Sequence, residues 1–158
     1  SVVRLAHLPD FERAHMLDKL KGLEEFSARP WVKPPPLAQC RIAIVSTAGL
    51  HVRSDRPFGP SATATDYRII PADTQAADLV MSHQSVNYDR TGFQEDHNVA
   101  FPLDRLNELA RERAIGSVAA FHYSFMGAAP IRKIEAKARE LAGLLKKDRV
   151  DAVLLCPV

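Results

Sequence analysis

Short apolar runs alternate along this chain with longer stretches in which apolar residues recur at helical spacing. The runs are rich in β-branched residues, and segments of this length and composition are typical of strands. Five segments are expected to be strands: 41–46, 67–71, 77–82, 115–121 and 149–158. The second is expected to be short or at a sheet edge. The last, with its unbroken apolar run at 152–155, predicts a strand buried on both faces.

Three stretches carry the helical pattern: 9–26, 102–114 and 130–148. Pro102 and Pro130 stand where a helix tolerates proline best, at its first position. Strands that alternate with helices indicate right-handed crossovers and a mostly parallel sheet covered on both faces. The predicted fold class is therefore α/β, a doubly wound, Rossmann-like or flavodoxin-like sheet of about five strands.

A proline-rich stretch, 28–40, separates the first helix from the first strand. Its prolines bar regular hydrogen bonding, so it is expected to be an extended connector that Trp31 holds to the body. This pattern predicts an N-terminal helix and proline-rich arm over 1–39 and an α/β domain over 40–158. The polar segment 83–101 is unusually long for a loop of a compact domain, and such loops are typically functional or disordered.

Composition narrows the function classes. The chain has 158 residues and a formal net charge of +2, which favours neither a nucleic-acid partner nor a membrane surface. No apolar run approaches the roughly 20 residues of a membrane span, and the first residues lack the apolar core of a secretory signal. The chain has only 2 cysteines, so a reducing, cytoplasmic location is expected rather than a disulfide scaffold.

Ligands of such sheets bind beyond the carboxyl ends of the strands, so the residues after each predicted strand are the candidate site. Small polar residues, histidines and a tyrosine gather there: Ser46, Thr47, His51, Ser82, His83, Asp89, His122, Tyr123, Ser124 and Cys156. The histidines could act as acids or bases, orient a substrate, bind a metal or be structural. No metal-ligand spacing such as HxH supports a metal site, and none is predicted.

Residues 46–49, "STAG", are a segment of small residues that contains Ser46 and Thr47. This segment could hold an anion or carboxylate, or could be a simple tight turn. Cys40 precedes the first strand and Cys156 ends the last, so they are expected at opposite edges of a parallel sheet and too far apart for a disulfide. Cys40 is then a buried filler, and Cys156 is the thiol of interest.

Several of these segments resemble one family. The stretch 78–127, with Ser82-His83, "EDHN", "FPLDRL" and "HYSFMG", resembles the selenoprotein B family of glycine/sarcosine/betaine reductase and D-proline reductase, and so do "RIAIVSTAGLHVRSD" and "VDAVLLCPV". The resemblance implies reductive cleavage of a C–N bond. In that family a partner subunit holds the substrate amine on a pyruvoyl group, and a selenolate or thiolate attacks carbon, so the resemblance implies the same chemistry here. His83 and His122 are hypothesised to orient the substrate or move protons, and Ser46 and Thr47 to hold its carboxylate.

Members of the family continue past the last strand into a Pro-Val-(selenocysteine or cysteine)-Pro-x-Cys segment. The nucleophile is therefore expected directly after Val158, and a UGA codon there would explain the ending "CPV". On this hypothesis Cys156 is a neighbour of the nucleophile, and the chain is expected to be inactive as it stands. A natural short homologue or a proteolytic fragment is the alternative.

The leading interpretation is thus a reductase domain for a small amino acid or amine, with no cofactor in this chain and with selenocysteine in the full-length form. Partner reductase subunits or a thiol reductant, and a homodimer, are the expected partners. A small-molecule- or metal-binding domain is the second interpretation. A non-catalytic subunit that docks on a catalytic partner is the third.

Overall fold

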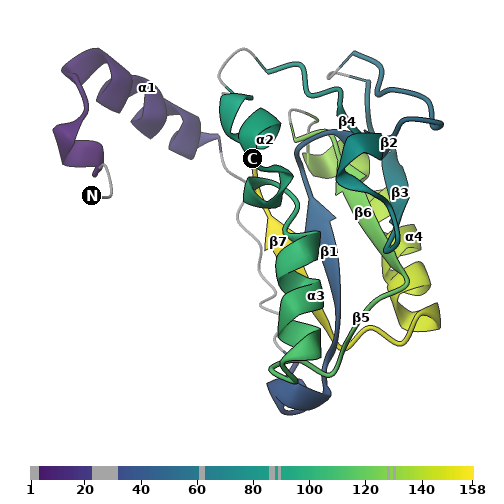
Figure 1. The fold of residues 1–158 in the computed structure, drawn as a ribbon. Coiled ribbons are helices and arrows are strands. Elements are labelled where there is room, and N and C mark those ends of the chain that lie inside the picture. The colour runs from purple at the N-terminus through teal and green to yellow at the C-terminus, as the bar shows by residue number, and fades with distance from the viewer. Residues whose placement is uncertain are drawn as a thin grey trace. The chain divides into compact units, whose positions relative to one another are not determined.

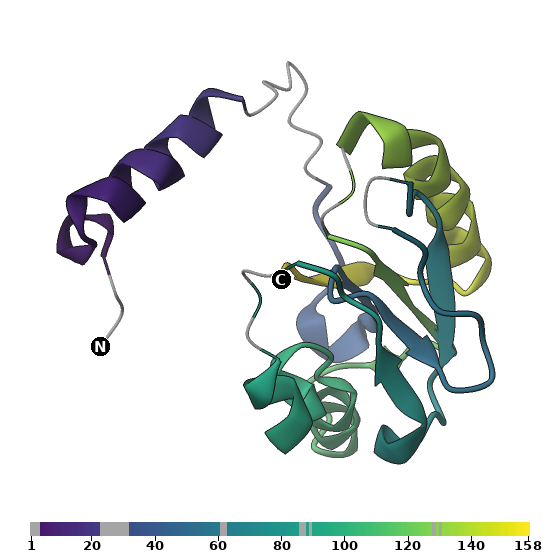
Figure 2. The ribbon, with the colours of Figure 1, turned by 90° about the horizontal axis from the view of Figure 1, so that it is seen from above.

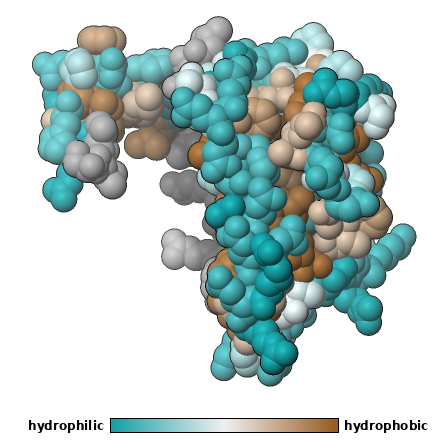
Figure 3. All heavy atoms as spheres, viewed as in Figure 1, coloured by the Kyte–Doolittle hydropathy of each residue, from teal (hydrophilic) through white to brown (hydrophobic). Residues whose placement is uncertain are grey.

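The computed structural model describes residues 4–22, 32–60, 63–85, 88, 90–127, 129 and 131–158. The chain divides into two compact units, 1–33 and 34–158. In the first unit a 3₁₀ turn, η1 (Leu5–His7), precedes α1 (Asp10–Lys21), which confirms a helix within 9–26. Apolar side chains of α1 are exposed, with Phe11 74% accessible, and Figure 3 shows apolar atoms on this helix. Trp31 lies outside the described residues.

The second unit contains a larger and a smaller sheet (Figure 1). Its elements in chain order are η2 (Leu37–Gln39), β1 (Arg41–Ser46), β2 (Leu50–Val52), β3 (Tyr67–Pro71), η3 (Ala76–Asp78), β4 (Leu79–Met81), α2 (Thr91–Glu95), η4 (His97–Val99), α3 (Leu103–Arg111), β5 (Ser117–Val118), β6 (Phe121–Phe125), α4 (Ile131–Lys147) and β7 (Ala152–Cys156).

β1 is the central strand of the five-stranded sheet. β7 runs parallel to it along one edge, while β5 and β6 share the other edge, also parallel. β3 pairs with β6 in the antiparallel direction, so the sheet is mixed. The prediction of an α/β domain is confirmed, but a doubly wound parallel sheet is not what the structure has. The reason lies in the connection from β1 to β3, which has no helix among its described residues, and parallel neighbours need such a crossover.

The predicted strand at 77–82 is shorter than expected and is not part of the large sheet. Its core forms β4, which pairs antiparallel with β2 in a separate two-stranded sheet. This small sheet is joined to the end of the large one through Gly49, whose N–H donates to the Phe125 carbonyl at 2.9 Å. The small sheet therefore stands beside the carboxyl end of β6.

Two helices cover opposite faces of the large sheet (Figure 2). On one face Ile42 and Ile44 of β1 pack with Phe101, Leu103 and Leu106 around α3. On the other face Tyr123 and Phe125 of β6 pack with Leu141 of α4. The alternation of β1 and β6 residues between the two clusters follows from the two-residue period of a strand.

The predicted strand at 115–121 is interrupted. β5 ends at Val118 and β6 begins at Phe121, and between them the regular ladder with β1 is lost. The Ile44 N–H, which would face a main-chain carbonyl, donates instead to His122 Nδ1 at 2.9 Å. The Ala120 N–H donates to a carboxylate oxygen of Asp148 at 2.8 Å. Side chains thus supply hydrogen-bond acceptors that the main chain lacks at this bulge.

β7 is more exposed than its apolar run predicts. Leu155 is 69% accessible and Val153 37%, so the prediction of a strand buried on both faces is wrong. β7 lies at the sheet edge with no strand paired to its outer side in the described part of the chain, and α4 covers β6 rather than β7. Among the helices that the structure describes, none is long and apolar enough to cross a membrane.

Candidate functional site

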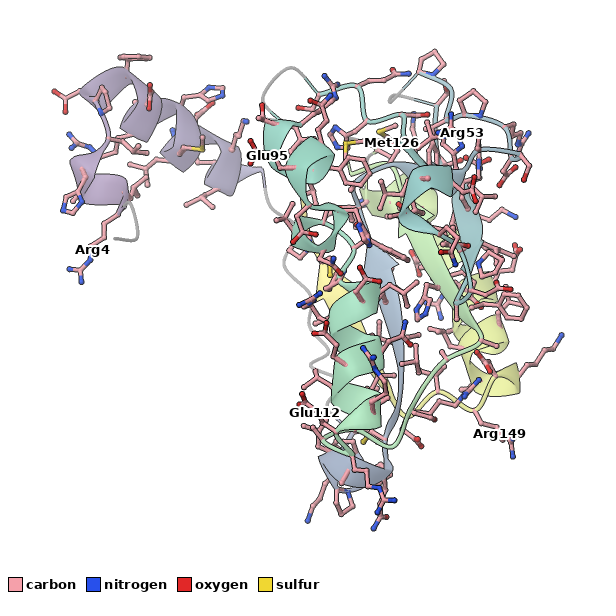
Figure 4. All side chains as sticks on the ribbon, viewed as in Figure 1. Arg4, Arg53, Glu95, Glu112, Met126 and Arg149 are labelled. Carbon is pink, nitrogen blue, oxygen red and sulfur yellow. The ribbon has the colours of Figure 1, made fainter. Side chains whose placement is uncertain are left out.

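The strands β1, β6 and β7 end together at one edge of the large sheet. Ser46 pairs with Ser124 on one side and with Cys156 on the other, so the residues that follow these strands meet. Met126 lies at this end, whereas Arg149, just after α4, lies at the opposite end (Figure 4). This edge is the one at which the sequence predicts a site.

Two of the predicted site residues hold main chain in place. Ser46 and Ser124 have no accessible surface. The Ser46 hydroxyl donates to the Ala100 carbonyl at 2.9 Å, and the Ser124 hydroxyl accepts the Leu50 N–H at 2.9 Å. Both side chains therefore anchor the loops that form the edge.

Thr47 organises the chain that follows β7. Its N–H donates to the Cys156 carbonyl at 3.1 Å, and its hydroxyl oxygen accepts the Val158 N–H at 2.8 Å. These bonds hold residues 157 and 158 across the carboxyl end of β1. Thr47 is partly accessible, unlike Ser46.

His51 and Ser82 form a pair between the strands of the small sheet. His51 Nδ1 lies 2.9 Å from the Val52 carbonyl, which can only accept, so this nitrogen carries the proton. The other ring nitrogen, Nε2, accepts a hydrogen bond from the Ser82 hydroxyl at 2.7 Å. His51 is buried and Ser82 is partly accessible. The predicted residues His51 and Ser82 are thus brought together, with the histidine tautomer fixed by the main chain.

His83 is buried beside them. Its Nδ1 accepts the Ser85 N–H at 3.2 Å, and Arg90 donates to its carbonyl oxygen. Burial, and then the charge of Arg90, lower the pKa of His83 below its ordinary value, so the ring is neutral at neutral pH. Gly49 has a φ of +64°, and a Cβ on it would lie 3.1 Å from the His83 nitrogen, so this approach of the two backbones favours glycine.

The structure does not bring His122 to this edge. Because β6 starts at Phe121, His122 lies near the start of the strand, and its side chain has no accessible surface. Burial, offset in part by Asp148, lowers the pKa of His122 to about 4. Tyr123 packs edge-on against Tyr67 on the α4 face, with ring centroids 5.8 Å apart, and burial raises its pKa. Asp89 lies outside the described residues.

Comparison with known proteins adds what the geometry alone does not contain. A sequence model of the family "Glycine/sarcosine/betaine reductase selenoprotein B" matches residues 17–157. The chain belongs to this family. The resemblance read from the sequence is therefore confirmed.

Curated relatives of the selenoprotein B family are similar over most of this chain. The D-proline reductase subunit gamma of Acetoanaerobium sticklandii is 34% identical over 149 residues, 88% of this chain and 60% of the relative. The glycine reductase complex component B subunit gamma of Symbiobacterium thermophilum is 30% identical over 152 residues, 89% of this chain and 35% of the relative. The sarcosine reductase complex component B subunit beta of Peptoclostridium acidaminophilum is 31% identical over 153 residues. The chain thus spans 60% of one relative and 35% of another. No solved structure matches.

Sequence reasoning missed two residues of the candidate site, Gly49 and Arg90. Gly49 stands within the segment of small residues, where a glycine before a short strand is a signal for a turn. Arg90 follows Asp89 in the long polar loop and carries no periodic or motif signal. Its proximity to His83 arises only from the fold.

Both cysteines are free thiols, which agrees with the expectation that they form no disulfide. Cys40 is buried, as expected of a filler. In the described part of the chain no group of three or more His, Cys, Asp or Glu side chains is placed to hold a metal ion.

Cys156 is expected to be a slow nucleophile. Burial raises the pKa of its thiol, and only the thiolate reacts readily, so the reactive form is scarce at neutral pH. Iodoacetamide should label Cys156 several-fold more slowly than a free thiol such as glutathione, with a rate that rises as the pH is raised. Peptide mapping by mass spectrometry separates it from Cys40. Labelling at neutral pH as fast as that of glutathione would contradict the expectation.

Proposed function

We propose that this chain is the α/β domain of a reductase component that takes part in reductive C–N bond cleavage of a small amino acid or amine. The match of the family over residues 17–157 carries the proposal. The names of the relatives refer to D-proline, glycine and sarcosine, and each of these molecules has a nitrogen bonded to a saturated carbon beside a carboxylate. Partner subunits belong to the proposal, since the relatives are named as subunits of larger enzymes.

The geometry of the edge supports this proposal. Thr47 holds the chain that follows β7 at the carboxyl end of β1, and the pair His51–Ser82 and His83 stand at the small sheet joined to the same end. In this proposal Thr47 positions that following segment and His83 orients the substrate. Cys156 does not fit the attacking thiolate, because burial keeps its thiol protonated.

The nucleophile is therefore proposed to be a selenolate or thiolate outside the described residues, and its chemistry is attack on the carbon of the C–N bond. A selenocysteine after Val158 and a pyruvoyl group on a partner subunit stay predictions from the resemblance. The reducing, cytoplasmic location also stays a prediction. His122 has no accessible surface and its Nδ1 accepts the Ile44 N–H, so its proposed catalytic role is weaker than that of His83.

The overall reaction must balance. The C–N bond breaks, carbon and nitrogen each gain a hydrogen, and a dithiol supplies the electron pair and the protons as it becomes a disulfide. The test uses the full-length gene product with the subunits that copurify with it, a dithiol, and D-proline, glycine, sarcosine or betaine in turn. We expect one substrate to be consumed with one disulfide formed per C–N bond broken, and iodoacetate to abolish turnover.

The control is the D-proline reductase of Acetoanaerobium sticklandii under the same conditions. If that enzyme turns over and the present preparation consumes none of these substrates, the proposed function is wrong.

A non-catalytic docking subunit is the second candidate. The observation that favours it is the exposed apolar edge strand β7, with Leu155 69% accessible, in a family whose relatives are subunits of complexes. In that case the full-length protein would form a stable complex in size-exclusion chromatography. Turnover would then be unchanged when its own thiols and selenols are alkylated before assembly.

A further inference from the structure

His83 carries a buried hydrogen-bond donor with no acceptor. The residue is 5% accessible, and within the described part of the chain its Nε2 has no hydrogen-bond partner. Because Nδ1 accepts the Ser85 N–H, the neutral ring must carry its proton on Nε2. A buried N–H without an acceptor destabilises the fold, and such groups are rare unless they serve a ligand or a functional purpose.

Arg90 brings a positive charge to this donor. Its guanidinium donates to the His83 carbonyl oxygen and is close enough to lower the pKa of the ring. No carboxylate of the described residues forms an ion pair with Arg90. A guanidinium has five N–H donors, so most remain available after one bond to a carbonyl oxygen. Among the described residues the site therefore combines the positive charge of Arg90 with a His83 donor that needs an acceptor.

The surroundings of His83 are apolar on two sides. The Tyr88 ring meets the His83 ring at an interplanar angle of 62°, with centroids 5.0 Å apart. The Met126 side chain packs at Gly49, 3.1 Å from where a Cβ would stand, and the same point lies 3.2 Å from the His83 Cα. In surroundings of low polarity a charge-assisted hydrogen bond is stronger than in water. Ser82 and Gln84, the chain neighbours of His83, are accessible, so His83 lies just beneath the surface.

We propose that His83 and Arg90 form a carboxylate-binding site, in which the Nε2–H of His83 donates to one carboxylate oxygen and Arg90 supplies the positive charge. The inference rests on the proposed function for its ligand, the carboxylate of the amino-acid substrate. It assigns the recognition of that carboxylate to the small sheet and the loop after β4. It thereby replaces the earlier hypothesis for Ser46, whose hydroxyl is already bonded to main chain.

The test is a titration that needs no turnover. The imidazole resonances of His83 in the full-length protein are followed by NMR as acetate, glycine or methylamine is added. We expect saturable shifts of the His83 Nε2 and its proton with acetate and with glycine, and none with methylamine, which lacks a carboxylate. An unchanged His83 resonance with acetate and glycine, or an equal shift with methylamine, overturns the proposal.

Two substitutions at His83 separate binding from structure. His83→Asn keeps a side-chain acceptor near the position of Nδ1 but removes Nε2, and His83→Gln places an amide N–H near the position of Nε2. We expect His83→Asn and Arg90→Gln each to weaken acetate binding by about tenfold or more, and His83→Gln to weaken it much less. Equal weakening by both His83 variants would show a structural role instead.

Arg111→Gln is the matched control, because Arg111 also donates to one main-chain carbonyl, that of Asn107, on an exposed surface. It should leave acetate binding unchanged. If a His83 variant does not fold, the wild-type titration alone still decides the proposal. The two proposals fail separately, since turnover without a carboxylate-dependent shift at His83 would remove this site and leave the reductase function intact.

Discussion

Replacing His122 with phenylalanine is expected to lower the free energy of unfolding by about 3 kcal/mol at neutral pH. The imidazole is fully buried and accepts the Ile44 N–H in the middle of the central strand. Phenylalanine has no acceptor and is larger, so the variant leaves a buried N–H unpaired and crowds a packed site that includes Phe101. Urea unfolding followed by circular dichroism measures the change.

His15→Phe is the control for the chemical change alone. His15 is exposed on α1, so this variant should alter the unfolding free energy by less than about 0.5 kcal/mol. If His122→Phe behaves like His15→Phe, the imidazole is not the acceptor that closes the ladder.

Wild type and His122→Phe together also test how the contribution of His122 to stability depends on pH. Its pKa in the folded state, about 4, lies below the ordinary value of 6.5, so the unfolded state binds the proton first as the pH falls. The stabilisation is complete above pH 6.5 and is lost progressively toward pH 4. The lowering of the His122 pKa from 6.5 to about 4 corresponds to about 3 kcal/mol of unfolding free energy. The gap in unfolding free energy between wild type and His122→Phe should therefore close across that window, and a gap that stays constant would contradict the assignment.

Replacing Asp148 with alanine is expected to cost about 3 kcal/mol of unfolding free energy. One carboxylate oxygen accepts from the Arg41 guanidinium, with Nε at 3.2 Å, and the other accepts the Ala120 and Phe121 N–H groups at 2.8 and 3.3 Å. The Asp148 side chain is 14% accessible and that of Arg41 27%, so water replaces these bonds poorly. Thermal and urea unfolding of Asp148→Ala measure the loss.

Glu135→Ala is the control for Asp148→Ala, because Glu135 pairs with Arg139 on the exposed face of α4. Such a surface pair contributes about 0.3–0.5 kcal/mol. Burial alone would raise the pKa of Asp148, but the hydrogen bonds from Arg41 and from the Ala120 N–H outweigh it and lower the pKa. The stabilisation is thus present above the ordinary value of 3.8 and is lost as the pH falls through the folded-state pKa. An Asp148→Ala effect equal to that of Glu135→Ala would show that the carboxylate does not hold the bulge.

His122 and Asp148 also show which features of the fold cannot be predicted from the sequence. The strand at 41–46 and the helices at 103–111 and 131–147 follow from local patterns, because periodic apolar residues fix both the type and the face of an element. The break between β5 and β6 does not, since it depends on Asp148, which is 28 positions from Ala120. A side chain that replaces a main-chain acceptor leaves no mark on the hydrophobic pattern. For this reason His122 was expected at a strand end and lies near a strand start.

The candidate site was anticipated in part for a similar reason. The rule that ligands gather at the carboxyl edge placed Thr47, Ser82, His83 and Cys156 near strand ends, and the structure has them there. The same rule does not distinguish serines whose side chains bond to main chain, such as Ser46 and Ser124, from residues that face a ligand. That distinction rests on hydrogen bonds between distant segments, as with Ser46 and Ala100, which are 54 positions apart.

The central place of β1 has a consequence for how the chain folds. Among the described residues, every parallel pairing of the large sheet involves β1, so this strand must wait for partners from much later in the chain. Arg41 bonds to Val118 across 77 positions and to Asp151 across 110. Contacts of such sequence separation slow folding, because a long loop is ordered before the contact is gained. During synthesis β1 stays without its β7 partner until the residues between Arg41 and Asp151, 110 positions apart, have been made. Over that interval its open edge is the place where association with other chains begins.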